Sequence, residues 1–205
     1  MSREGGSPTP IRLGAEEILA RARSILANKN ISYRLKYPNG GSDPRKATPG
    51  DLFKGEDGKL RLVCDCAGFV AWCCGYPRRL AGFPDTASVK GIVTGGVHSN
   101  WINTDSMIEE SENGEFFKRL EKPVVGGIVV FHSNSKLYPK NPKMGHTGII
   151  SGVPVEVPPD REDWFNLISV IHCSGVDKKS GTAVRETTGK VWAGKQSYFL
   201  QWRGY

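Results

Sequence analysis

The order of the predicted elements constrains the fold of this chain more than any other feature of its sequence. Helical patterns dominate the first half, and the second half carries a run of apolar strand patterns with hairpin-type links. The predicted strands cover residues 124–131, 146–152, 167–172 and 198–202. Helices followed by such a run of strands are typical of an α+β domain with an antiparallel sheet.

The segment LVCDCAGFVAWCCGYP predicts a helix with clear signals at both ends. Asp65 is of a type that caps helix N-termini, which places Cys66 in the first turn. Gly75 followed by Pro77 is a signal that ends a helix. This helix is therefore expected to present Cys66 at its N-terminal end.

Two further helical patterns lie before and after this segment. Residues 15–28 place apolar side chains on one face, and Glu16 and Glu17 suit the positive end of a helix. Residues 104–120 are expected to be helical in parts, with a break near residues 113–114. Residues 1–13 are interpreted as a flexible leader and residues 14–205 as a single domain, because no linker or internal repeat follows.

The charge of the chain indicates affinity for polyanions. The formal net charge is +7, and basic proteins are attracted to nucleic acid, anionic lipid or the anionic polymers of a cell wall. The basic residues are spread along the chain, and the pairs at residues 78–79 and 178–179 are interpreted as solvated surface. A dedicated nucleic-acid site is therefore not expected.

The cysteines and the N-terminus indicate where the chain is made. An odd number of five cysteines in 205 residues does not predict a disulfide framework, so reduced thiols are expected at synthesis. The first residues, MSREGGSPTP, contain no apolar segment, so no signal peptide is expected. No stretch has the apolar length of a transmembrane helix. Synthesis in a cytoplasm is the resulting expectation.

Cys66 is the strongest candidate for chemistry. A thiolate is the reactive form of cysteine, so a catalytic cysteine needs a lowered pKa. Free N–H groups and the positive dipole end at a helix N-terminus stabilise such an anion and can form part of an oxyanion hole. Gly68 would let a substrate backbone approach closely. Cys73 and Cys74, deeper in the helix, are interpreted as buried structural thiols.

Two of the four histidines are placed to act with this cysteine. His146 begins an apolar strand, where an imidazole can face a helix N-terminus across a cleft. His172 ends the next predicted strand and can share that edge of the sheet. A base that accepts the thiol proton needs a third group to orient its other nitrogen, and His172 is the candidate.

Several segments in order resemble motifs of the NlpC-type peptidoglycan hydrolases, papain-like cysteine peptidases of bacterial cell walls. Residues 65–70 (DCAGFV) resemble the family signature Asp-Cys-Ser-Gly-Phe-Val, and residues 145–150 (GHTGII) its Gly-His-Val-Gly-Ile-Tyr strand. Residues 170–174 (VIHCS) are similar to its Val-Ile-His-Ala-Ser strand, and residues 126–131 (GGIVVF) to its Pro-Gly-Asp-Leu-Val-Phe strand. Residues 32–35 (SYRL) resemble its Pro-Tyr-x-Trp segment more weakly.

This resemblance implies a Cys66–His146–His172 triad on a papain-like α+β core, with the cysteine helix packed on the antiparallel sheet. The usual reaction of the family is hydrolysis of an amide bond in the peptidoglycan stem peptide, often between D-glutamate and diaminopimelate. No metal or organic cofactor is implied.

The resemblance also bears on substrate binding. It implies that Tyr33 lines the active site, and Asp65 and Gly68 are expected to contact substrate beside it. Residues 153–166, between the two histidine strands, are longer than a simple hairpin and are expected to alter access to the cleft.

Other interpretations remain open at this point. A related papain-like amidase cuts between sugar and peptide, and an acyltransferase on a similar core would show an apolar membrane-facing segment, which the sequence lacks. Cys64, Cys66, Cys73 and Cys74 form a cluster, but zinc ligands usually come as C-x₂₋₄-C pairs on a turn. A wall-binding domain with a relic site would not need the intact cysteine and histidines.

The sequence constrains the biological role less than it constrains the chemistry. One interpretation is an antibacterial toxin, such as a type VI secretion effector, delivered into a rival's periplasm and countered by a cognate immunity protein that plugs the cleft. The other is a phage or endogenous wall-remodelling enzyme. In both, a monomer without a signal peptide is expected to act on the cell wall.

Overall fold

The structure is a computed structural model that describes residues 11–26, 28, 31–33, 45–54, 58, 60–80, 83, 102–132, 145–156, 158–175 and 182–204. Its helices are α1 (Ala15–Ser24), α2 (Cys66–Cys74), α3 (Thr104–Asn113), α4 (Arg161–Leu167) and the 3-10 turn η2 (Gly189–Val191). Its strands are β1 (Ile31–Tyr33), β2 (Asp51–Lys54), β3 (Leu60–Cys64), β4 (Phe117–Leu120), β5 (Ile128–Phe131), β6 (His146–Gly152), β7 (Ser169–Cys173), β8 (Val184–Thr188) and β9 (Ser197–Trp202). Within these residues no helix has the length and apolar character needed to cross a lipid bilayer.

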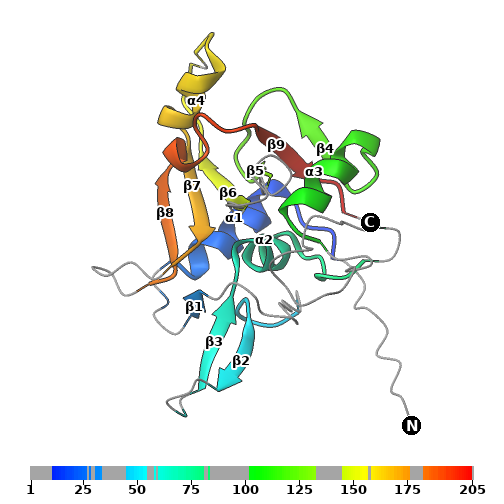
Figure 1. The fold of residues 1–205 in the computed structure, drawn as a ribbon, viewed down its shortest axis with the longest axis vertical. Coiled ribbons are helices and arrows are strands. Elements are labelled where there is room, and N and C mark those ends of the chain that lie inside the picture. The colour runs from blue at the N-terminus through cyan, green and yellow to red at the C-terminus, as the bar shows by residue number, and fades with distance from the viewer. Residues whose placement is uncertain are drawn as a thin grey trace, which may run out of the picture.

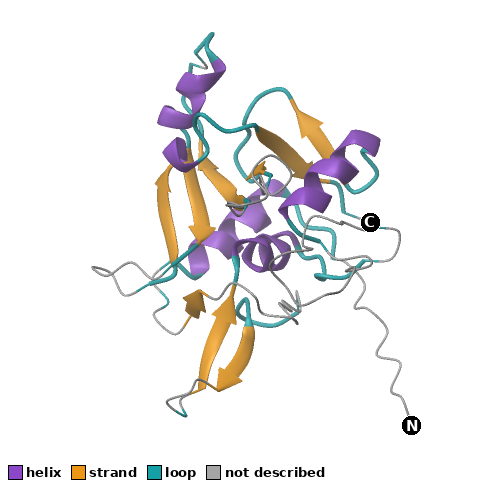
Figure 2. Cartoon of the chain, viewed as in Figure 1, coloured by secondary structure: helices purple, strands orange, loops and turns teal. Residues whose placement is uncertain are grey.

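The strands form two sheets of different size. The larger has six strands in the order β4-β9-β5-β6-β7-β8, and every neighbouring pair is antiparallel. The smaller has the order β1-β3-β2, with β1 parallel and β2 antiparallel to β3. The β2–β3 pair extends away from the larger sheet, and α2 follows β3 into the centre of the molecule (Figure 1). The larger sheet is surrounded by helices, whereas the smaller one is not (Figure 2).

Apolar layers cover both faces of the larger sheet. One layer joins α1, α2 and α3 to the sheet residues Ile128, Val130, Ile149, Ile171, Cys173, Val184 and Leu200. The other layer joins α4 and the segment after η2 to the sheet residues Val129, Phe131, Ile150, Val170 and Phe199. Because side chains alternate between faces along a strand, the neighbours Ile149 and Ile150 belong to different layers. We call these the α2 face and the Trp192 face, after α2 and the buried Trp192.

The expected fold class and several elements are confirmed. The molecule is α+β with an antiparallel sheet, and the predicted strand at residues 146–152 has the bounds of β6. Asp65 caps α2, and Gly75 ends it in the left-handed conformation with φ of 80°. The strands β7 and β9 also lie within a residue or two of their predicted positions.

Three local predictions were wrong or too long. Residues 117–120 form β4 rather than helix, because Gly114 ends α3 with φ of 72° and the chain then pairs with β9. Residues 124–127 form a turn before β5, in which the Gly127 N–H donates to the Val124 carbonyl. Residues 11–13, assigned to the leader, are held in place: the Ile11 N–H donates to the Gly75 carbonyl at 2.7 Å.

Candidate active site

The start of α2 positions Cys66 as the sequence predicts. The Asp65 carboxylate accepts a hydrogen bond from the Gly68 N–H at 2.6 Å, and Cys66 is the first residue of the helix. The Ala67 N–H and the Thr147 N–H from β6 both hydrogen-bond to the Cys66 sulfur and lower its pKa. The sulfur therefore lies at the helix N-terminus, against the backbone of the residue that follows His146.

The Cys66 thiol is buried, contrary to the expectation of an activated thiol. The residue is 6% exposed, and burial raises its pKa to about 12, with a further contribution from the Asp65 carboxylate. The backbone N–H groups and Arg78 oppose this rise but do not outweigh the loss of water around a thiolate. In this conformation Cys66 is a protonated thiol at neutral pH.

His146 and His172 form a hydrogen-bonded pair, as expected from their places at two strand ends. The Nε2 of His146 lies 2.8 Å from the Nδ1 of His172, and the Nε2 of His172 lies 3.1 Å from the hydroxyl of Thr187 on β8. The His146 ring stacks on the Trp192 indole with centroids 5.3 Å apart. Gly148 allows β7 to approach β6 closely, since a Cβ there would lie 2.6 Å from the Val170 side chain and 3.0 Å from the His172 Cβ.

Both imidazoles of the pair are neutral at neutral pH. Burial, together with the cations Lys195 and Arg185, lowers the pKa of His146 to about 4. Burial lowers the pKa of His172 to about 3, with contributions from His146 and Arg185. With both rings neutral, one donates its N–H to the other. The ring nitrogens are thus held in a defined arrangement, as a base and its orienting group require.

The histidine rings and α2 approach the sheet from different faces. Alternation along β6 places His146 on the Trp192 face together with Ile150, whereas Thr147 and Ile149 point toward α2. Among the described residues no hydrogen bond joins the Cys66 sulfur to the His146 ring. The structure thus brings the two histidines together and brings the sulfur to the neighbouring backbone, but it does not bring sulfur and ring into contact.

The three residues expected to contact substrate all lie around the start of α2. Tyr33 lies in β1 and pairs with Cys64, directly before the cap of α2. Asp65 is occupied by the helix cap and by an ion pair with Arg78. A Cβ at Gly68 would lie 2.9 Å from the Arg78 guanidinium and 3.1 Å from the Asp65 carboxylate, so the space left by this glycine is filled by that ion pair.

Arg78 is the clearest correction to the sequence-based interpretation. It was assigned to solvated surface together with Arg79, but its side chain is only 4% exposed and pairs with Asp65 at 2.5 Å. Its Nε also donates to the Ile102 carbonyl at 3.0 Å. Arg79 is exposed as expected, and residues 178–179 lie outside the described residues. Arg78 therefore fixes the residue that caps the Cys66 helix.

Replacing Arg78 by methionine is expected to lower the free energy of unfolding by about 2–3 kcal/mol. The Asp65 carboxylate, 18% exposed, would lose its charged partner, and an unpaired, partly buried charge is costly. Denaturant unfolding measures the change. The matched control is Arg79→Met at the exposed neighbour, for which about 0.5 kcal/mol or less is expected. Equal losses in both variants would contradict a specific role for Arg78.

His132 is a third histidine, which the sequence analysis did not select. It directly follows β5, and alternation from Val130 places it on the α2 face. Its Nδ1 lies 3.3 Å from the Asp105 carboxylate of α3, and its ring meets the edge of Tyr198. The position of His132 after an apolar strand was visible in the sequence. Its partner Asp105 lies 27 residues earlier, a separation that matches no known motif spacing.

The remaining cysteines of α2 are buried, as predicted. Cys73 and Cys74 are fully buried, and burial raises the pKa of each thiol. In the part of the chain that the structure describes, no group of three or more histidine, cysteine or acidic side chains converges as a metal ion would require. The cysteine cluster considered for zinc therefore has no additional ligands there.

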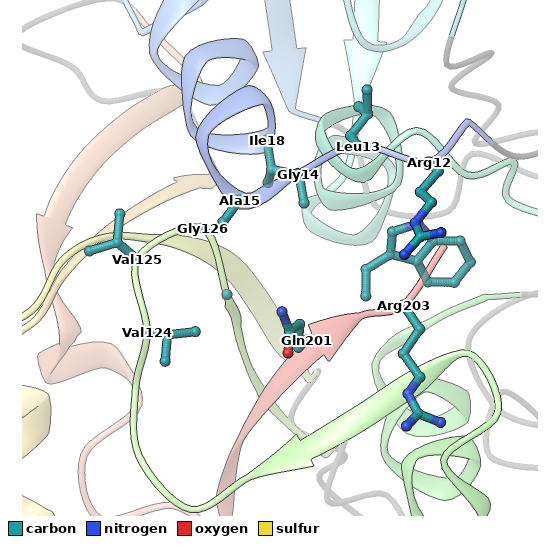
Figure 3. A pocket seen from close by; sticks show the side chains of 12 residues that line it. Arg12, Leu13, Gly14, Ala15, Ile18, Val124, Val125, Gly126, Gln201 and Arg203 are labelled. Atoms are coloured by element: carbon teal, nitrogen blue, oxygen red, sulfur yellow. The ribbon is translucent and has the colours of Figure 1, made fainter. Parts of the chain in front are cut away.

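A cavity of about 390 Å³ lies away from the histidine pair, at the start of α1. It is lined by residues 12–15 and 18, the turn at residues 124–127 and the end of β9 at residues 201–203. Figure 3 shows Arg12, Gln201 and the two exposed valines of the turn around it. None of Cys66, His146 and His172 lines this cavity.

The fold and site together define an α+β protein with a buried thiol at a helix N-terminus and a histidine pair at the adjacent strand end. No protein-family model matches the chain, and the comparison with curated proteins finds no matching relative.

Proposed function

We propose that this protein is a cysteine hydrolase with a papain-like core of the NlpC type, and that it cleaves an amide bond in the peptidoglycan stem peptide. One observation carries the proposal. The two histidines expected from the sequence share a 2.8 Å hydrogen bond at the end of the sheet where the Cys66 sulfur meets the Thr147 N–H. A thiol, a base and an orienting group within one neighbourhood are the parts that this chemistry uses.

In the proposed mechanism, His146 removes the proton from Cys66 and the thiolate attacks the amide carbonyl. The N–H groups at the start of α2 stabilise the oxyanion of the tetrahedral intermediate. His146 then protonates the leaving amine, which departs and leaves a thioester on Cys66. Water, deprotonated by His146, hydrolyses the thioester and restores the free thiol. Before the reaction, His172 holds one ring nitrogen of His146.

The conformation described here is a resting state in this proposal. The proton stays on sulfur, because the pKa of Cys66 is about 12 and that of His146 is about 4. Catalysis requires the start of β6 to turn the His146 ring toward the α2 face, where the sulfur already contacts the next residue. Such a turn would also expose the sulfur and lower its pKa.

The same chemistry has a second candidate for the base. His132 lies on the face of the sheet that α2 covers, and Asp105 holds its Nδ1, which leaves Nε2 to accept a proton. In a Cys66–His132–Asp105 arrangement the base already lies on the α2 face, so no histidine ring would have to turn to the other face of the sheet. We favour His146, because the N–H of the next residue, Thr147, already contacts the Cys66 sulfur. Variants of His146 and His132 distinguish the two candidate bases.

The proposed setting is the cell wall of a bacterium. The chain would be made in the cytoplasm and act in the periplasm, either as a toxin of a contact-dependent secretion system with a cognate immunity protein, or as a phage or wall-remodelling enzyme. Its net charge of +7 suits the anionic polymers of the wall. The proposed substrate bond is an amide, so the first question is which amide bond of the wall is cleaved.

Mass spectrometry of purified peptidoglycan after digestion tests the proposal. Cleavage within the stem peptide, with fragments ending in D-glutamate, is the expected result. Fragments in which the whole stem is separated from the sugar would assign an amidase on the same fold instead. Intact peptidoglycan from several wall chemotypes, after treatment with a reduced and folded protein, would reject wall hydrolysis altogether.

A further inference from the structure

Three buried sulfurs gather where β3, α2 and β7 meet. Cys64 ends β3, Cys66 begins α2 and Cys173 ends β7. The Cys173 thiol donates toward the Cys64 carbonyl with a sulfur–oxygen distance of 3.6 Å. The Cys64 thiol donates to the Asp65 carbonyl at 3.2 Å, and its side chain contributes to the raised pKa of Cys173. Two cysteines separated by 109 positions in the sequence are therefore neighbours in the fold.

We propose that Cys64 and Cys173 are a disulfide pair, which closes when the chain enters an oxidising compartment. The Cys173 sulfur already lies against Cys64, 3.6 Å from its carbonyl oxygen, whereas the Cys66 sulfur is held by the backbone N–H groups of Ala67 and Thr147. Each of the pair is at most 4% exposed, so the bond would form inside the fold. This inference does not depend on hydrolase activity.

The chemistry is thiol–disulfide exchange with a small disulfide oxidant such as oxidised glutathione. The Cys64 thiolate attacks the oxidant, which forms a mixed disulfide and releases one glutathione thiol. The Cys173 thiolate then attacks the Cys64 sulfur, which closes the protein disulfide and releases the second glutathione. The protein loses two protons and two electrons, and the oxidant gains them.

The bond would brace the proposed active site. Cys64 lies two residues before Cys66, and Cys173 directly follows His172, so the disulfide would tie the strand that leads into α2 to the strand that carries the histidine pair. Because the closed loop spans 109 positions, the chain-entropy model places it among the more stabilising disulfides. Oxidation is therefore expected to raise Tm by about 5–10 °C.

Peptide mapping of the full-length protein tests the inference. The reduced, folded protein is incubated with excess oxidised glutathione until thiol content is constant, and the remaining thiols are then alkylated. The expected result is one disulfide between the peptides that contain Cys64 and Cys173, with the other three cysteines alkylated, and a raised Tm that reductant reverses.

Variants supply the matched comparison. Cys173→Ala is expected to abolish the rise in Tm on oxidation, whereas Cys74→Ala, which removes another fully buried thiol, is expected to keep it. Should Cys173→Ala not fold, mapping of the wild-type chain decides alone. Five alkylated cysteines after complete incubation, or a disulfide between any other pair, overturns the proposal. If the proposed wall hydrolysis is not found, this inference is unaffected, because none of these readouts measures hydrolysis.

Discussion

Replacing Cys66 by alanine is expected to lower amide hydrolysis of peptidoglycan by at least about 10³-fold, since the variant has no nucleophile to form the thioester. The fold is expected to survive. Alanine favours the first turn of a helix, and the cap from Asp65 to the Gly68 N–H does not involve the sulfur. Release of soluble wall fragments by equal amounts of folded variant and wild-type protein measures the effect.

The control for this change is Cys74→Ala, at the far end of the same helix. Cys74 is also fully buried, so this variant bears a similar packing loss without touching the proposed nucleophile. Activity near the wild-type level is expected once thermal unfolding shows that the variant is folded. Hydrolysis by the Cys66→Ala protein at more than about a tenth of the wild-type rate would remove Cys66 from the mechanism.

Replacing His146 by alanine is expected to be about as damaging as loss of Cys66, because a nucleophile and its base act as a unit. His172→Ala is expected to be milder, with a loss of about 10²-fold, because an orienting group acts through the base. The comparison is made as kcat/KM on a soluble stem-peptide substrate. Circular dichroism checks that the packing on the Trp192 face is preserved in both variants.

His132→Ala decides between the two candidate bases. Near wild-type activity is expected for this variant if His146 is the base. The wild-type pH profile gives a second readout, because His146 must be unprotonated to accept a proton. With its pKa at about 4, activity is expected to be retained as pH falls until that value is approached. Loss of activity in His132→Ala, with retention in His146→Ala, would assign the base to His132.

Local sequence signals located the elements of the candidate site well. The cap at Asp65, the stop at Gly75 and the strand at residues 146–152 all depend on short-range chemistry, and the structure confirms each. The contact between His146 and His172 also followed from the sequence, because antiparallel neighbours bring the start of one strand beside the end of the next.

The features that the sequence did not predict depend on tertiary packing. Period-two alternation separates His146 from Thr147, but it does not say which of the two faces α2 will cover. The burial of Arg78 likewise follows from the position of Asp65, 13 residues earlier, and a pair of adjacent arginines looks the same in a solvated loop. Residues 117–120 continued a helical pattern, and only pairing with β9 made them a strand.

The burial of α2 on all sides has a consequence for how this protein can change over evolutionary time. All nine of its residues are buried, so the segment that carries the proposed nucleophile is also the centre of the core. Substitutions that tune the reactivity of residue 66 will therefore alter folding as well, and catalytic adaptation cannot proceed independently there. Divergence in substrate preference is expected to accumulate in surface segments around a centre that stays almost fixed.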